Sequence, residues 1–146
     1  MTEFSVVEIC AGAGGQSLGL HKAGFSHQIA IEIDETAAET LRTNLGVKVV
    51  VGDVADTSVW NPVEHAGVTL LAGGVPCPPF SIAGKQLGSS DERDLFAWAI
   101  EQVAVIKPRA VMLENVRGLA GPRFAAYRQR VIDRLGELGY VGPLVL

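Results

Sequence analysis

The sequence is short of cysteine, aromatic side chains and long apolar runs, and two of these shortages exclude a class of protein. Two cysteines among 146 residues, far apart at Cys10 and Cys77, do not form the framework of a disulfide-rich secreted domain. No apolar run approaches the roughly 20 residues that a membrane-spanning helix needs. We therefore expect a protein of a reducing, cytoplasmic compartment, with no membrane partner and no metal site.

Basic residues are scarce in the first part of the chain. The net charge is −4; residues 1–84 carry 9 acidic and 3 basic side chains, whereas residues 85–146 carry 7 acidic and 9 basic ones. Binding to a nucleic-acid backbone depends on Lys and Arg. The first part therefore suits a small-molecule site and the second tolerates phosphate better. We expect the chain by itself to bind nucleic acid weakly.

The sequence is rich in apolar residues, 48% of the chain, and in glycine, with 17 residues, whereas aromatic residues make up only 6%. Together these values are typical of an α/β domain with many tight turns, and the length predicts a single domain over 1–146. Apolar runs bounded by turn residues alternate with segments of helical period, which predicts a mostly parallel sheet. The expected strands are 4–10, 27–33, 48–51, 69–73 and 110–115, and the expected helices are 16–23, 35–45, 95–106 and 123–138. A long irregular stretch over 74–93 predicts a functional loop.

The last eight residues, Gly-Tyr-Val-Gly-Pro-Leu-Val-Leu, begin a further apolar run that stops at Leu146. A sheet that stops at the start of a strand predicts a domain that is incomplete at its C-terminus. A short edge strand that closes the domain is the alternative. We expect the unfinished edge to pair with a complementary chain or with a second copy of this one.

The first expected strand runs into a glycine-rich turn, Ala11-Gly12-Ala13-Gly14-Gly15, and then into a helix. Glycines at such a turn let the backbone bend sharply and let a ligand approach closely. Glu32 ends the second expected strand, 20 residues after Gly12, where its carboxylate can accept hydrogen bonds from both ribose hydroxyls. Ser17 stands where a dinucleotide fingerprint has its third glycine, which favours adenosylmethionine over NAD.

The third expected strand ends in Gly-Asp-Val, with Asp53 placed to accept a hydrogen bond from an adenine amino group. Ile33 and Val54 would then lie on the two faces of the adenine ring. Taken singly, the glycine turn can be purely structural and each carboxylate can be a solvated or capping charge. Their order at the ends of successive strands indicates a nucleotide site at the carboxyl edge of the sheet.

A cysteine framed by prolines follows the fourth expected strand, in Gly-Val-Pro-Cys-Pro-Pro-Phe-Ser. The prolines stiffen the backbone and favour Cys77 as a positioned nucleophile over a merely structural thiol. Cys10 is interpreted instead as packing beside the glycine turn. Glu114 ends the fifth strand, where a carboxylate is either paired or functional. Cys77 and Glu114 would face one crevice.

The motifs A-G-A-G-G, E-I-D, G-D-V, G-V-P-C-P-P-F-S, D-E-R-D-L-F and E-N-V-R-G-L, in this order, resemble the first six motifs of the cytosine-C5 DNA methyltransferases, from about residue 6 to 119. The resemblance implies a Rossmann-like methyltransferase fold, S-adenosylmethionine as cofactor, S-adenosylhomocysteine as product, and DNA as substrate. Cys77 would add to C6 of cytosine, Glu114 would engage the base, and Lys85 would contact a phosphate or remain a solvated loop charge. The cofactor residues would be Cys10, Gly12, Gly14, Glu32, Ile33, Asp53, Val54 and Pro76.

The sequence departs from the family pattern in several places. Glu8 and Cys10 stand where the family usually has Asp and Phe, and Pro78 stands where it has Gln. The family's later arginine-rich segment, target-recognition domain and final segment are absent. We therefore expect a truncated or split half of the enzyme, with little or no methyl transfer by itself.

The resemblance also suggests where such an enzyme works. We expect a restriction–modification enzyme of a bacterium, phage or archaeon that acts on nucleoid DNA. The alternatives are a tRNA cytosine-C5 methyltransferase, a non-catalytic subunit that binds S-adenosylmethionine and, more distantly, a Rossmann oxidoreductase that binds NAD.

Overall fold

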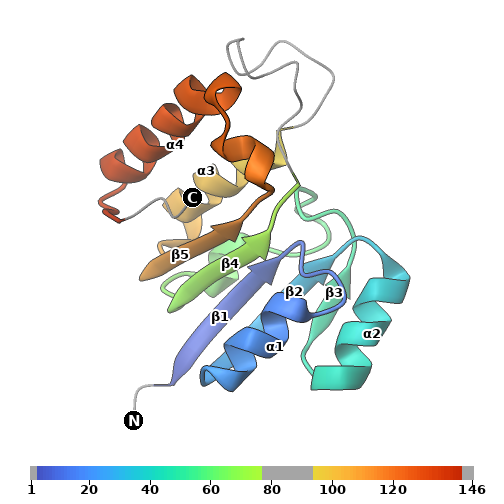
Figure 1. The fold of residues 1–146 in the computed structure, drawn as a ribbon. Helices are drawn as coiled ribbons and strands as arrows, with labels where there is room; N and C mark the ends of the chain where they lie inside the picture. The colour runs from blue at the N-terminus through green and yellow to red at the C-terminus, as the bar shows by residue number, and fades with distance from the viewer. Residues whose placement is uncertain (1–2, 77–93, 143–146) are drawn as a thin grey trace.

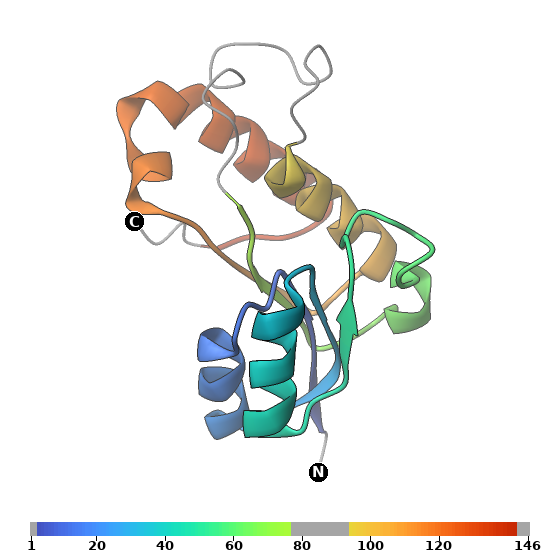
Figure 2. The ribbon, with the colours of Figure 1, turned by 90° about the vertical axis from the view of Figure 1, so that its right-hand side faces the viewer.

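The computed structural model describes residues 3–76 and 94–142, and it shows one parallel sheet with helices on both faces (Figures 1 and 2). The strands are β1 (Phe4–Ile9), β2 (Phe25–Glu32), β3 (Val49–Val51), β4 (Leu70–Gly74) and β5 (Ala110–Glu114). The α-helices are α1 (Gly15–Lys22), α2 (Glu35–Leu45), α3 (Leu95–Ile106) and α4 (Ala125–Glu137). Short 3-10 helices are η1 (Pro62–His65), η3 (Arg117–Ala120) and η4 (Pro122–Phe124).

The strand order is β3-β2-β1-β4-β5, and every neighbouring pair is parallel. The order reverses between β1 and β4, because β2 and β3 extend the sheet to one side of β1 while β4 and β5 extend it to the other (Figure 1). In open α/β sheets, ligands bind at such a reversal, beyond the carboxyl ends of the strands. The predicted α/β fold class and its parallel sheet are confirmed.

Helices from the two parts of the chain cover different faces of the sheet. Helices α1 and α2 lie on one face over β1, β2 and β3, whereas α3 lies on the other face together with η1 (Figures 1 and 2). The apolar stripe of α3 is buried in the main core, where it meets strand residues and the first turn of α4; this core includes Ile9, Leu71, Phe96, Ile100, Val103 and Tyr127. On α2, the buried stripe consists of Ala38 and Leu41.

The expected strands and helices agree with the observed ones to within two residues at each end. Differences of two residues occur at the start of β2 and at the start of α4, where the sequence pattern predicts a helix from residue 123. There the chain forms η3 and η4 first, and α4 begins at Ala125. Gly118, Gly121 and Pro122 disfavour a regular α-helix in the segment just before α4. The expected loop over 74–93 lies outside the described residues from residue 77 onward.

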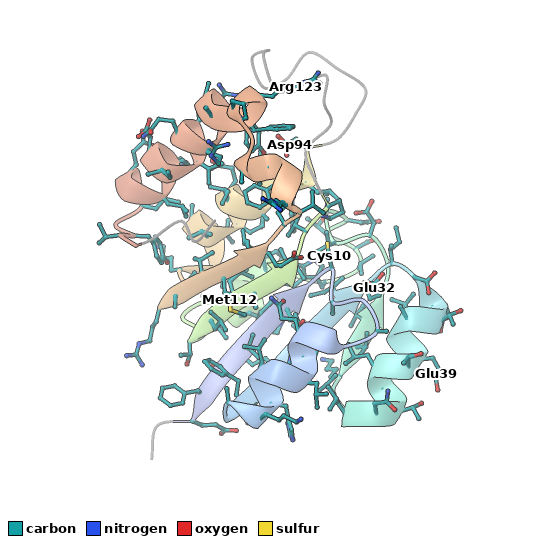
Figure 3. The ribbon with its side chains drawn as sticks, viewed as in Figure 1. Cys10, Glu32, Glu39, Asp94, Met112 and Arg123 are labelled. Atoms are coloured by element: carbon teal, nitrogen blue, oxygen red, sulfur yellow. The ribbon has the colours of Figure 1, made fainter. Side chains whose placement is uncertain are left out.

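Strands β3 and β5 form the two outer edges of the sheet. Within residues 3–76 and 94–142, no further strand pairs with the outer side of β5. The side chain of Met112 on β5 is 41% exposed (Figure 3). The pairing of this edge with a partner chain stays a prediction. In the same part of the chain, no helix is both long and apolar enough to cross a membrane.

Candidate active site

The chain turns sharply at the carboxyl end of β1. Cys10, Gly12 and Gly14 have positive φ angles of 51°, 59° and 103°. The φ angle at Gly14 favours glycine, and a Cβ atom there would lie only 2.7 Å from Cδ1 of Leu41 on α2, so a side chain would also displace this buried leucine. At Gly12, by contrast, a Cβ atom would meet nothing within 4 Å. The turn therefore packs against α2 on one side and is open on the other.

Glu32 connects the end of β2 to this turn. Its Oε2 atom accepts a hydrogen bond of 2.6 Å from the backbone N–H of Gly12, and its Oε1 atom accepts one of 2.9 Å from that of Asp34. The residue is 9% exposed. Each carboxylate oxygen can accept a second hydrogen bond. Glu32 is therefore fixed in orientation and still has the acceptor capacity for two hydroxyl groups.

The end of β3 brings Asp53 and Val54 to the same edge of the sheet. Asp53 accepts a hydrogen bond of 2.9 Å from the backbone N–H of Ala55. Val54 is only 6% exposed and packs in the main core beside Trp60, whereas Ile33, just after β2, is 69% exposed. Of the two apolar residues expected to contact adenine, Ile33 thus presents an open surface and Val54 presents little.

Cys10 lies at the end of β1, near Glu32 (Figure 3). Burial raises the pKa of its thiol to about 11, with further contributions from the negative charges of Glu32 and Asp53. A thiol with this pKa is almost entirely protonated near neutral pH and is a poor nucleophile. The interpretation of Cys10 as a packing residue agrees with this environment. The two carboxylates that disfavour a thiolate here would favour a bound cation.

Glu114 ends β5 and pairs in register with Gly74 at the end of β4. A Cβ atom at Gly74 would lie 3.6 Å from Oε2 of Glu114 and 3.8 Å from the carbonyl oxygen of Cys10. Gly74 thus lies between the Glu114 carboxylate and the carbonyl oxygen of Cys10, which precedes the glycine turn, with room for a group the size of a methyl. The turn that follows β1 and the carboxylate that ends β5 come from opposite sides of the strand-order reversal and therefore meet at Gly74.

Asn115 fixes the chain that leaves β4. Its Nδ2 atom donates a hydrogen bond of 2.8 Å to the carbonyl oxygen of Val75, and its Oδ1 atom accepts one of 2.9 Å from the backbone N–H of Val116. Pro76 follows Val75 and is exposed. Cys77 and Lys85 lie outside the described residues. Asn115 was not singled out from the sequence, because a bond to a backbone group 40 residues away leaves no local signal.

The sequence analysis also did not identify a buried polar cluster next to the glycine turn. Glu8 of β1 is 0% exposed; its Oε2 atom accepts a hydrogen bond of 2.6 Å from Oγ of Ser17 and lies 2.6 Å from Nε2 of His27. The cluster joins β1, α1 and β2. A carboxylate inside the apolar run of β1 was the available signal, because a charged group is rarely buried without a partner.

Comparison with known proteins gives consistent results. The family model of the C-5 cytosine-specific DNA methylases matches residues 4–146. The chain is 71% identical over 142 residues to the type II methyltransferase M.NaeI of Lentzea aerocolonigenes, and 53% identical over 141 residues to M.NgoMIV of Neisseria gonorrhoeae. These matches cover 97% and 96% of this chain but only 34% and 44% of the two relatives.

The fold also matches a solved structure. An Escherichia coli prophage protein, described as a DNA modification methyltransferase, aligns with a TM-score of 0.72 and 25% identity. This alignment covers 92% of the present chain and 38% of that protein. The chain therefore spans about a third to under half of the length of the proteins that it resembles.

Proposed function

The chain belongs to the family of C-5 cytosine-specific DNA methylases, and on this basis we propose that it holds the cofactor site and the cytosine-reacting residues of a DNA (cytosine-5)-methyltransferase. The observation that carries the proposal is the position of Gly74, within van der Waals reach of both the Glu114 carboxylate and the carbonyl oxygen of Cys10, just before the glycine turn. M.NaeI and M.NgoMIV are named type II methyltransferases. We propose the same role here: modification of cytoplasmic DNA in a restriction–modification system.

The cofactor that fits the first part of this site is S-adenosylmethionine. Glu32 has acceptor capacity for the ribose hydroxyls, and Gly12 leaves room for close approach. Exposed Ile33 offers an apolar surface for the adenine ring. Glu32 and Asp53 supply the negative potential that a positively charged sulfonium compound prefers. When bound, S-adenosylmethionine supplies the methyl group and leaves as S-adenosylhomocysteine.

The other predicted cofactor residues have smaller roles in this proposal. The Gly14 conformation shapes the turn, and Cys10 packs beside it as a neutral thiol. Val54 supports the end of β3 from the core, because Nε1 of Trp60 donates a hydrogen bond of 2.7 Å to its carbonyl oxygen. Pro76, exposed after Val75, borders the cofactor site next to the nucleophile.

In the proposed reaction, the Cys77 thiolate attacks C6 of a cytosine that has been flipped out of the duplex. A bond forms between Sγ and C6 while the electron pair of the C5–C6 double bond moves toward C5. Glu114 shares a proton with N3 and stabilises the charge that develops on the ring. C5 then takes up the methyl group. Loss of the C5 proton to a base restores the double bond and releases Cys77.

Trapping of the covalent adduct tests this proposal. A duplex with 5-fluorocytosine at the target position cannot lose a proton from C5, so an adduct on Cys77 accumulates even when turnover is slow. We expect accumulation over hours in the presence of S-adenosylmethionine, because the net charge of −4 weakens DNA binding. Mass spectrometry of the digested protein identifies the modified residue.

Two variants serve as controls for this experiment. Cys77→Ala should form no adduct, whereas Cys10→Ala should still form one. An adduct on Cys10, or an adduct formed by Cys77→Ala, would show that the nucleophile is assigned wrongly. No adduct from the unsubstituted chain at high concentrations of DNA and donor would contradict the proposal that the chain holds the cytosine-reacting residues.

A further inference from the structure

Arginines gather in the chain after Glu114, and those other than Arg117 have interactions within the molecule. Residues 114–130 contain four arginines and one carboxylate. Arg128 donates from Nη1 to the carbonyl oxygens of Leu119 and Gly121, both at 2.7 Å. The guanidinium of Arg130 lies over the ring of Tyr127, 5.6 Å from its centroid. The two bonds from Arg128 hold α4 against the segment that follows β5.

Arg117 differs from these arginines. It is exposed, and it begins η3 three residues after Glu114. Over residues 3–76 and 94–142 its side chain makes no hydrogen bond or ion pair. An unpaired guanidinium at the carboxyl edge of the sheet is free to meet a ligand that carries negative charge.

The backbone that carries Arg117 is held on both sides. On one side, Asn115 binds the carbonyl oxygen of Val75 and the backbone N–H of Val116. On the other, Arg128 binds the carbonyl oxygens that end η3. Arg117 therefore keeps a fixed position relative to Glu114. Three residues span at most about 11 Å, which corresponds to a few nucleotides at about 3.4 Å of rise per nucleotide.

The distribution of charge directs a polyanion to this part of the edge. Residues 32–56, at the glycine-turn side, contain six carboxylates and two basic residues, whereas 114–130 has the opposite balance. A DNA strand would be repelled from the first region and attracted to the second. Holding a flipped nucleotide also requires contacts to its own backbone, and the planar guanidinium group binds phosphate with two parallel hydrogen bonds.

We propose that Arg117 binds a phosphate of the DNA strand that carries the target cytosine, next to the base engaged by Glu114, and that Arg128 acts as a positioning residue that holds η3 for this contact. The proposal rests on the proposed function and adds to it a residue that determines where the DNA backbone lies.

The salt dependence of DNA binding tests the contact directly. Binding of a fluorescent duplex to the full chain is measured by fluorescence anisotropy at salt concentrations from about 50 to 200 mM. Arg117→Ala should weaken binding about 5-fold and reduce the slope of log K against log salt by about 0.9, the value for one lost phosphate contact. Arg117→Lys should keep the slope, because it keeps the charge.

Arg109→Ala is the matched control. Arg109 is an exposed arginine directly before β5, at the opposite end of the same strand, and its side chain has no ion pair over the described residues. Its removal should change neither affinity nor slope. Equal effects of Arg117→Ala and Arg109→Ala would overturn the proposal, as would the absence of any DNA binding by the unsubstituted chain at the lowest salt.

Adduct trapping separates failure of this proposal from failure of the proposed function. With saturating DNA, Arg117→Ala should form the Cys77 adduct more slowly than the unsubstituted chain but still detectably, because the arginine holds the backbone of the flipped nucleotide and does not touch the reacting atoms. An intact adduct with an unchanged salt slope overturns the phosphate contact alone. A changed slope without any adduct supports the contact and overturns the proposed function alone.

Discussion

The two regions of the carboxyl edge hold their shape by different means. At the β1–β2–β3 side, the backbone itself provides the geometry: Gly14 has a positive φ, and backbone N–H groups orient Glu32. At the β4–β5 side, side chains hold the backbone, since Asn115 binds Val75 and Arg128 binds the carbonyl groups of η3 and its end. The first region is compact and acidic, whereas the second is exposed and basic.

This difference suits two different ligands. A compact region with fixed acceptors and a negative potential suits a small cation whose polar groups are all recognised. An exposed region with free positive charge suits a polymer that must enter, be bent and leave. If the proposal holds, the hydrogen bonds within the chain fix the cofactor part of the site before its ligand binds, whereas the nucleic-acid part is a set of anchored side chains.

The largest expected effect concerns the exposed region. Glu114→Gln should slow formation of the Cys77 adduct by about 10²–10⁴-fold, because the side chain can no longer share a proton with N3. The matched control is Glu137→Gln, an exposed carboxylate of α4 that pairs with Arg134. Quantitative mass spectrometry of the adduct over time provides the rates. An equal rate for Glu114→Gln and the unsubstituted chain would remove Glu114 from the reaction.

The next effect concerns the support of the compact region. Glu8→Ala leaves His27 and Ser17 buried without their shared partner, which should cost about 3–5 kcal/mol of unfolding free energy. Urea unfolding measures this loss, with Ser26→Ala as the control, because Ser26 is exposed on the same strand as His27. A loss below about 1 kcal/mol would show that the cluster contributes little to stability.

Glycine substitutions compare the two regions directly. Gly14→Ala should destabilise the chain by about 1–3 kcal/mol, because φ is 103° and the new Cβ atom would meet Leu41. Gly118→Ala, in η3, should change stability by less than about 0.5 kcal/mol, because its Cβ atom would meet only a methyl group of Val116, at 3.9 Å. Similar losses in both variants would contradict the contrast between the regions.

A smaller effect is expected at Asn115. Asn115→Ala removes the hydrogen bond to the carbonyl oxygen of Val75 and should cost about 1 kcal/mol. It should also slow adduct formation while leaving cofactor affinity unchanged, because Val75 lies two residues before Cys77. Parallel calorimetry and trapping separate these outcomes. Loss of cofactor affinity in this variant would show that the two regions are not independent.

The smallest effect lies outside both regions. Arg134 binds Glu101 through two hydrogen bonds of 2.8 Å, which lower the pKa of the Glu101 carboxyl group. This exposed pair should contribute less than about 1 kcal/mol. Because the folded-state pKa is lowered, the contribution is present at neutral pH and lost as the pH falls through that pKa. Unfolding of Glu101→Gln should therefore differ from the unsubstituted chain at pH 7 and converge with it in acid.

The sequence was sufficient for those features that have a local signal. The bounds of α3, for instance, were predicted because Phe96, Ile100 and Val103 follow the helical period that burial imposes. Contacts between distant segments have no such signal. The bonds from Asn115 to Val75 and from His27 to Glu8 join residues 40 and 19 positions apart, and only the assembled sheet brings them together.

The candidate site shows the same limit. Glu32 and Glu114 were predicted at the strand ends because polar residues that terminate apolar runs mark the carboxyl edge. The burial of Val54 was not predicted, because it depends on a contact with Trp60, which lies in the segment after β3. Likewise, the positive φ of Cys10 follows from the geometry of the turn rather than from its residue type.

The most direct test of the division between the two regions is calorimetric titration of S-adenosylmethionine into the chain and into its Glu32→Gln and Glu114→Gln variants. Glu32→Gln removes the charge and replaces one of the two acceptor oxygens with an NH₂ donor, so affinity should fall by about 30-fold or more. Glu114→Gln should bind with an affinity within about twofold of the unsubstituted chain, because its change is confined to the exposed region. Equal losses in both variants, or a loss in Glu114→Gln alone, would contradict the account.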